Sequence, residues 1–421
     1  MAIKTKKKLL VRRTRINKDY NSKDSVDSVD NLDNLDDSNN LLDIMDLKHQ
    51  LSTKKSILAN NKLPLDVLFE PELKYQNTFV IDKDGSKNIY LEYGPLIKIL
   101  EDLGLTRSRD TTSNHLFGII NKKYYNTNFL LLNDFQFIAD FKNKFSLYNN
   151  LKLCFPRHYN TYYPQSFLLN ANTYWNEDFH NKIYIARPIG GGTGIDIVIV
   201  YNESTFNKAK NLIYKPMYKS GVSLTEYITN PMLIKGRKFH CRAYLMFTLF
   251  DNKFRAYLLK ENQILTAKDK YKNADWANKD IHDTHFKSSY RNDLIFPYDL
   301  YGETTPMISE KDIDIIYNNS RMLCKEVSKI AVANVYHYSN TKNTWQIFGI
   351  DLLIKDDLNV FIIEINGTMT GYGMFNSNKK IEKPYFDWIS DVVVKPCLFP
   401  HLEIPQKPSN IPLYEAVIDN Y

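Results

Sequence analysis

The sequence predicts a mixed α/β (α+β) protein with more than one lobe. Three observations predict this fold class. Apolar runs of strand-like composition recur through residues 168–366, residues 310–337 carry apolar side chains at helical spacing, and 421 residues exceed the size of one small domain. The hydrophobic fraction of 43% is ordinary for a globular protein with a sizeable core.

Residues 1–62 differ in composition from the rest of the chain. A dense basic block at residues 4–18 explains the formal charge of +7, and an acidic, repetitive stretch with almost no aromatic residues follows it. We expect this tail to be disordered, because it cannot bury enough apolar surface to offset its ordering entropy. The basic block is either a nuclear-localisation or nucleic-acid patch or a solvated tail. The remainder is close to neutral, which gives no case for a nucleic-acid-binding core.

Cysteine usage and hydropathy favour an intracellular, cytoplasmic protein, or a nuclear one if the basic block is a localisation signal. Cys154, Cys241, Cys324 and Cys397 lie far apart without C-x-x-C spacing, which fits a reducing compartment. No run of 18 apolar residues and no apolar signal-peptide stretch occurs. We therefore expect no membrane partner.

Residues 63–167 read as a small N-terminal α/β lobe. Strands are expected at residues 77–83 and 88–93 around the turn DKDGSK, and the following GPLIKILEDLGL has helical spacing up to Gly104.

Residues 168–235 read as a central lobe built around a hairpin. Strand-like runs at residues 181–189 and 195–201 flank the glycine run at 190–194. No helix pattern follows the glycines, so a β-hairpin lid is expected there. Its backbone N–H groups either approach phosphate oxygens or simply form a tight turn, because the run is neither G-x-G-x-x-G nor a Walker A sequence.

Residues 236–395 read as a C-terminal lobe, followed by an extension at 396–421. EYITNPMLI before it, then KFHCRAYLMFTLF and KFRAYLLKENQIL, are expected to be successive strands. A long helix is expected at residues 310–337, and the last two strands, TWQIFGIDLLI and NVFIIEING, are joined by the turn KDDL.

The last two strands carry the most informative polar residues. Asp351 interrupts one apolar strand, and Glu364 and Asn366 share one face of the next. Pairing across the turn would bring three oxygen ligands together, and hard oxygen ligands suit Mg²⁺. The alternative is that Glu364 pairs with a nearby cation. Two carboxylates and an amide within apolar strands favour a metal, because burying them without a counter-ion is unfavourable.

Basic residues near residue 240 suggest phosphate binding. Arg237, Lys238 and Arg242 alternate with Phe239 and Ala243 on entering a strand, which gives one face cations. Such a face is either solvated surface or a clamp for phosphates and a developing acyl-phosphate charge.

Several stretches, taken together and in order, resemble the tubulin tyrosine ligase-like family. KFSLYNNL (144–151) matches K-x-x-L-x-x-N-L, and YYPQSFLL (162–169) is similar to Y-P-x-T-F-x-L. IARPIGGGTGIDI resembles the strand and glycine loop, and GRKFHCRAYLMFT resembles G-R-K-F-D-x-R-x-Y. HDTHF (282–286) loosely resembles H-L-T-N-Y, and FGIDLLI and FIIEING resemble the metal motifs. The resemblance covers roughly residues 75–380.

The resemblance implies an ATP-grasp fold, with ATP and Mg²⁺ between two α/β lobes. It implies an ATP-dependent ligase that joins a free amino acid to a protein carboxylate, on tubulin or another acidic-tailed protein, through an acyl phosphate. By the same resemblance Lys144, Arg187 and the glycine loop (Gly191, Gly192, Thr193, Gly194) face phosphates, Glu226, Tyr227 and Ile228 flank adenine, and Lys238 and Thr284 contact nucleotide. Arg242 and Lys260 serve catalysis, and Asp351, Glu364 and Asn366 hold Mg²⁺.

Three positions depart from the family pattern. Arg187 stands where the family has lysine, His240 replaces the aspartate of K-F-D-x-R, and His285 replaces an asparagine. The first change keeps the charge, while the others alter nucleotide geometry or substrate choice. The alternative functions are a catalytically degenerate ATP-grasp protein that binds nucleotide and a partner, and nucleic-acid binding through the basic block.

The acceptor is expected to meet basic surface. Lysines and arginines between residues 253 and 291 form either a groove for an acidic tail or, at 268–291, a solvated mobile loop. These residues are Lys253, Arg255, Lys268, Lys270, Lys272, Lys279, Lys287 and Arg291.

Overall fold

The computed structural model describes twelve segments of the chain. They are residues 78–82, 89–107, 115–118, 131–133, 144–189, 195–218, 221–250, 253–284, 294–335, 344–366, 379–398 and 412–417. Every described residue belongs to one compact unit, Glu70–Tyr421. The predicted tail at 1–62, the glycine run and His285 lie outside the described residues.

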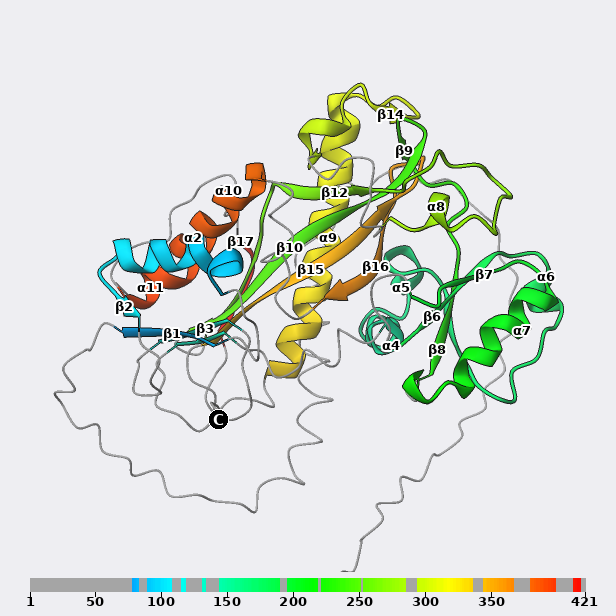
Figure 1. Ribbon diagram of the computed structural model, residues 1–421, viewed down its shortest axis with the longest axis horizontal. Helices are drawn as coiled ribbons and strands as arrows, with labels where there is room; N and C mark the ends of the chain where they lie inside the picture. The colour runs from blue at the N-terminus through cyan, green and yellow to red at the C-terminus, as the bar shows by residue number, and fades with distance from the viewer. Residues whose placement is uncertain are drawn as a thin grey trace, which may run out of the picture. The chain divides into compact units, whose positions relative to one another are not determined.

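A 13-stranded sheet and a 4-stranded sheet form the framework (Figure 1). The larger sheet consists of β1 (Thr78–Asp82), β2 (Thr106–Arg107), β3 (His115–Gly118), β4 (Leu131–Asn133), β9 (Leu233–Ile234), β10 (Arg237–Phe250), β11 (Lys253–Leu258), β12 (Asn262–Thr266), β13 (Ile295–Phe296), β14 (Thr304–Thr305), β15 (Thr344–Ile354), β16 (Val360–Asn366) and β17 (Pro412–Val417). The smaller sheet consists of β5 (Ser166–Leu169), β6 (Tyr184–Pro188), β7 (Val198–Val200) and β8 (Val222–Glu226). The predicted mixed α/β class is confirmed.

Nine described α-helices accompany the sheets. They are α2 (Ile89–Asp102), α4 (Lys144–Cys154), α5 (Tyr159–Tyr162), α6 (Glu177–His180), α7 (Glu203–Asn211), α8 (Lys279–His282), α9 (Glu310–Val335), α10 (Lys379–Ile389) and α11 (Lys395–Leu398), with a π-helical turn, η6 (Ser390–Val394), after α10. No helix among the described segments is long and apolar enough to cross a membrane.

Strand β10 organises the larger sheet, because its two faces pack against different helices. Alternate residues of a strand point to opposite faces. Cys241, Ala243 and Leu245 pack in one core cluster with side chains of α9 and α4, whereas Tyr244 and Met246 pack in another with α2, α10 and η6. Figure 1 shows α9 crossing the strands β10 and β15. The polar residues of the site lie at the N-terminal end of β10, on the same face as Tyr244.

Several predicted elements are confirmed. The hairpin on either side of the glycine run exists as β6 and β7, which pair antiparallel, and the long helix appears as α9. The last two strands appear as β15 and β16, and they pair antiparallel across the predicted turn.

Other predicted elements are wrong. Residues 89–93 of the predicted strand at 88–93 are helical instead, because α2 already begins at Ile89 and continues through GPLIKILED. KFRAYLLKENQIL is not one strand but two, β11 and β12, with Leu259, Lys260 and Glu261 between them. EYITNPMLI likewise divides between the end of β8 and β9.

The segment from Lys268 to Thr284 is an ordered connection rather than the mobile loop predicted there. Tyr271 N donates to the Gly236 carbonyl, and Asp269 N donates to the Asp280 carbonyl. Ile281 is buried, which anchors α8 against the larger sheet. Residues 285–291 of the predicted loop lie outside the described residues.

Candidate functional site

Charged side chains form one row across three neighbouring strands. Arg242 of β10 pairs in register with Asp351 of β15, which pairs in register with Glu364 of β16. Directly opposite residues on paired strands place their side chains on the same face. The predicted pairing of the two strands therefore brings Asp351 beside Glu364, and Asn366 lies two residues beyond Glu364, opposite Gly349.

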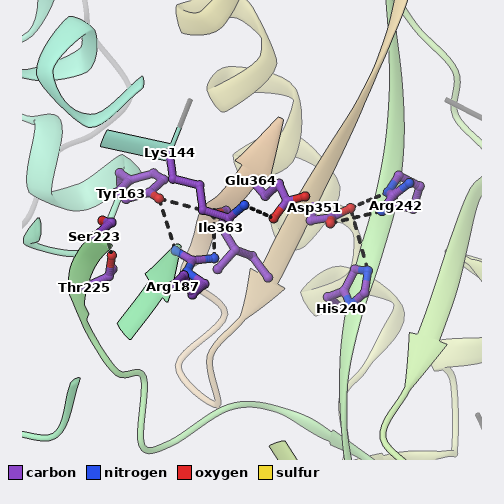
Figure 2. Close-up of polar contacts among 10 residues, drawn as sticks. All are labelled: Lys144, Tyr163, Arg187, Ser223, Thr225, His240, Arg242, Asp351, Ile363 and Glu364. Atoms are coloured by element: carbon purple, nitrogen blue, oxygen red, sulfur yellow. Dashed lines mark hydrogen bonds and ion pairs between the residues drawn. The ribbon is translucent and has the colours of Figure 1, made fainter. Parts of the chain in front are cut away.

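Arg242 and Asp351 form a buried, two-pronged ion pair. Both Nε and Nη2 of Arg242 donate to the carboxylate, the latter to Oδ2 at 3.1 Å (Figure 2). Arg242 is 5% exposed and Asp351 is 0% exposed. Burial by itself lowers the pKa of Arg242, but the neighbouring Asp351 charge and its hydrogen bonds more than offset that effect and raise it. The guanidinium fork matches a carboxylate or a phosphate geometrically.

Lys144 neutralises Glu364 from the opposite side of the row. It is the first residue of α4, and its Nζ lies 2.9 Å from Glu364 Oε2. Leu147 and Leu151 anchor this helix in the core that α9 covers. Glu364 thus pairs with a cation, as the alternative interpretation predicted. That cation is Lys144, which the family resemblance assigns to phosphate binding.

Arg187 reaches the same strand from the smaller sheet. Its Nη1 donates to the carbonyl of Ile363 at 3.0 Å, and its Nη2 donates to the Tyr163 hydroxyl at 3.2 Å. Tyr163 Oη donates in turn to the Ile363 carbonyl at 3.3 Å. Figure 2 shows this triangle beside the Lys144–Glu364 pair. Arg187 Nε is buried without a hydrogen-bond partner among the described residues, which leaves one donor for a ligand.

His240 occupies the position at which the family pattern has aspartate. Its Nδ1 lies 2.6 Å from Thr284 Oγ1, and its Nε2 lies 3.7 Å from Asp351 Oδ1. His240 is fully buried, and Thr284 is 6% exposed. The departure from the pattern therefore places an imidazole, not a carboxylate, next to the candidate metal ligand.

Lys238 lies in an aromatic environment at the start of β10. Its Nζ donates to Tyr227 Oη at 2.9 Å and lies 4.2 Å from the centre of that ring. Burial and the nearby positive charge of Arg187 lower the pKa of Lys238 to about 7. Tyr227 Oη also lies 2.7 Å from His282 Nδ1, and Trp276 stacks on the His282 ring. A cation in such surroundings gains strongly from an anionic ligand.

The predicted adenine segment lies at the end of β8. The N–H groups of Glu226 and Tyr227 donate to the carbonyls of Gln165 and Ile183. The Glu226 side chain forms an exposed ion pair with Lys182 at 2.9 Å, and Ile228 is half-buried. Tyr227 joins this segment to Lys238 through the contacts described above.

Lys260 is not brought into direct contact with the other predicted residues. Its Nζ lies 6.0 Å from the ring centre of Tyr317 on α9. Within the described segments it has no hydrogen bond or ion pair to the row of Arg242, Asp351 and Glu364. Arg237 was predicted to share one cationic face with Lys238 and Arg242. Strand alternation places its side chain on the other face of β10.

The donor set fits a hard divalent cation. Two carboxylates and an amide oxygen lie on neighbouring strands, which is the ligand chemistry that Mg²⁺ prefers. No group of three or more His, Cys, Asp or Glu side chains in the described part of the chain gathers as a metal site. A site using Asp351, Glu364 and Asn366 would therefore need further oxygen ligands, such as phosphates and water.

Sequence reasoning missed Tyr163 and Ile363, which contact Arg187, and the aromatic partners of Tyr227. Tyr163 belongs to the quoted Y-P segment, so its position was available as a signal. Nothing in the sequence pointed to Ile363, Trp276 or the buried Gln263, which pairs in register with Arg242.

Comparison with known proteins shows which family the chain resembles. The sequence model of the tubulin-tyrosine ligase family matches residues 122–293. The matched stretch is less than half of the chain, so the match shows similarity to this family. A probable tubulin–tyrosine ligase of Schizosaccharomyces pombe is 26% identical over 183 residues, which cover 43% of this chain and 43% of that protein. The tubulin-tyrosine ligase family is part of the ATP-grasp superfamily, and the mixed α/β architecture described above is consistent with that fold.

Other similar proteins bear the names of different activities. A tubulin monoglutamylase of Mus musculus is 22% identical over 233 residues, covering 49% of this chain and 18% of that protein. A probable alpha-tubulin polyglutamylase of Tetrahymena thermophila is 25% identical over 252 residues, covering 53% of this chain and 58% of that protein. The aligned region is thus less than two thirds of each relative's own length.

Proposed function

We propose that this chain is an ATP-dependent ligase that joins an amino acid to a carboxylate of a protein acceptor, with tubulin as the candidate acceptor. The observation that carries the proposal is the in-register row of Arg242, Asp351 and Glu364 with Lys144 beside it. The family relatives bear the names of tubulin ligases, glutamylases and glycylases, which supports the same reaction class.

The charge balance of the site favours polyphosphate. Lys144, Arg187, Lys238 and Arg242 are basic and buried, and the carboxylates near them are Asp351, Glu364 and, beside Lys238, Asp283. A surplus of buried cations is costly unless an anion joins them. Nucleotide phosphates supply that anion, and a divalent cation held by Asp351, Glu364 and Asn366 would neutralise the charge that develops on the transferred phosphoryl group.

The reaction requires positioning and charge stabilisation rather than a nucleophilic side chain. A substrate carboxylate oxygen takes the γ-phosphoryl group, which breaks the bond to the leaving diphosphate and forms an acyl phosphate. The amine then attacks the acyl carbon, the C–N bond forms, inorganic phosphate leaves, and the amine loses a proton to solvent. Arg242 would stabilise the negative charge on the acyl phosphate, and Lys144 would hold a phosphate while orienting Glu364.

A nucleotide-binding protein without catalysis is the second candidate. Asp351 is fully buried and already accepts two hydrogen bonds from Arg242, and His240 stands beside it. A carboxylate so occupied must be shared between arginine and metal during catalysis. This candidate predicts binding of ATP without transfer.

Incorporation of labelled tyrosine, glutamate and glycine into purified tubulin and cell lysate distinguishes the candidates. We expect ATP-dependent incorporation by the wild type and none by Glu364→Gln. Glu326→Gln is the matched control, because Glu326 forms a comparable, partly buried ion pair with Lys329 at 2.9 Å on α9. ATP binding without incorporation by any protein would support the second candidate and refute the ligase. Equal incorporation by Glu364→Gln and wild type would refute the assigned site.

A further inference from the structure

A β-bulge lies directly before Glu364. The register between β15 and β16 runs from Asp351 opposite Glu364 to Leu352 opposite Ile362, so Ile363 has no cross-strand partner. A bulge leaves the extra residue outside the ladder and re-aims the side chains next to it. The main chain at Ile363 therefore needs hydrogen bonds from elsewhere, and its conformation sets the direction in which Glu364 projects.

Those hydrogen bonds come from the smaller sheet. Arg187 Nη1 and Tyr163 Oη both donate to the Ile363 carbonyl, at 3.0 Å and 3.3 Å, and Arg187 Nη2 ties the two donors together at 3.2 Å. Tyr163 is 0% exposed and Arg187 is 6% exposed. Burial raises the pKa of Tyr163, against a smaller lowering by the Arg187 charge, so its hydroxyl stays protonated and can donate.

We propose that Arg187 and Tyr163 are positioning residues, which hold the bulged carbonyl of Ile363 and thereby orient Glu364 toward the metal. This inference rests on the proposed function, in which Glu364 is a metal ligand. The triangle links β6, which the family resemblance assigns to phosphate binding, with β16, which carries the metal ligands. Phosphate contact and metal binding are then coupled through one arginine.

The arginine at position 187 suits this role better than the lysine of the family pattern. A guanidinium offers several donors in a fixed plane and can reach Ile363 and Tyr163 at once while Nε remains for a ligand. A lysine ammonium keeps the charge but is a compact point donor on a flexible stem. Arg187→Lys therefore keeps the positive charge at this position but removes the paired hydrogen bonds to Ile363 and Tyr163.

The test measures Mn²⁺ binding to the full-length, nucleotide-free protein, using the electron paramagnetic resonance signal of free Mn²⁺. Two variants test the positioning role: Tyr163→Phe, which removes one oxygen, and Arg187→Lys. Glu364→Gln is the reference for loss of a metal ligand. Ser166→Ala is the matched control, because it removes buried hydrogen bonds to Thr225 and the Pro164 carbonyl without touching Ile363. Circular dichroism verifies the fold of each protein.

We expect Tyr163→Phe and Arg187→Lys each to weaken Mn²⁺ binding by about tenfold, the lower end for residues that orient a metal ligand. Glu364→Gln should weaken it more, and Ser166→Ala should match the wild type. If Arg187→Lys fails to fold, Tyr163→Phe decides alone.

Two results overturn the inference and are distinguishable. Wild-type Mn²⁺ affinity in Tyr163→Phe, with Glu364→Gln impaired, refutes the positioning role and leaves the proposed metal site standing. Wild-type affinity in Glu364→Gln refutes the metal site, and with it both the positioning role and the site assigned under the proposed function.

Discussion

Replacing Arg242 by methionine probes the central ion pair of the site. The change keeps much of the side-chain length but removes both donors to Asp351, which is 0% exposed and would remain as a buried carboxylate. Removing one partner of a buried pair typically costs about 3–5 kcal/mol, because the other charge is left uncompensated. For a cooperative unit of this size, that corresponds to a fall in Tm of roughly 6–10 °C.

Thermal and urea unfolding of four proteins tests this reasoning: the wild type, Arg242→Met, Asp351→Asn and the double variant. We expect the double variant to be more stable than Arg242→Met by about 2 kcal/mol, because it carries no buried unpaired charge. Lys383→Met is the surface control, since its ion pair with Asp387 is exposed and should contribute nothing measurable. An Arg242→Met protein within about 1 kcal/mol of wild type, or a double variant no more stable than it, would refute the argument.

Four further predictions concern three other positions. Because the pKa of Lys238 is about 7 in the fold and the usual value is 10.5, calorimetry should find ATP affinity falling as pH rises through 7 in the wild type but not in Lys238→Gln. Between pH 7 and 10.5 Lys238 is protonated in the unfolded chain but mostly neutral in the folded one. Its contribution to the free energy of unfolding should therefore rise with pH over this range, which urea unfolding at several pH values can check. Gln263→Met removes an amide nitrogen that is buried without a partner among the described residues, and it also removes the oxygen that accepts the long, 3.5 Å hydrogen bond of Tyr244. Because these effects oppose each other, thermal unfolding should find stability within about 1 kcal/mol of the wild type. Asn202→Ala should remove the capping box with Thr205 at the start of α7, costing about 1 kcal/mol in urea unfolding, while ligase activity stays at the wild-type level.

Residue order and strand periodicity were enough to predict the core of the site. Asp351, Glu364 and Asn366 were expected on paired strands, and the structure pairs Asp351 with Glu364 directly. Side-chain period and a short turn determine such a register locally, so sequence reasoning can reach it. The same reasoning misplaced the start of α2, because residues 88–93 were predicted as a strand, yet the helix already begins at Ile89.

What the sequence by itself determined was the set of chemical groups and their order along the chain: cations at 144, 187, 238 and 242, and oxygen ligands at 351, 364 and 366. The tertiary structure alone decided which of them meet. Arg187 and Ile363 are 176 positions apart and come together only because the smaller sheet lies against a bulge in β16. A bulge inserts one residue into a ladder without any sequence mark at Ile363, and a buried tyrosine hydroxyl acquires its partners from packing. Contacts of that kind depend on which surfaces the folded elements bring together, which local sequence patterns do not encode.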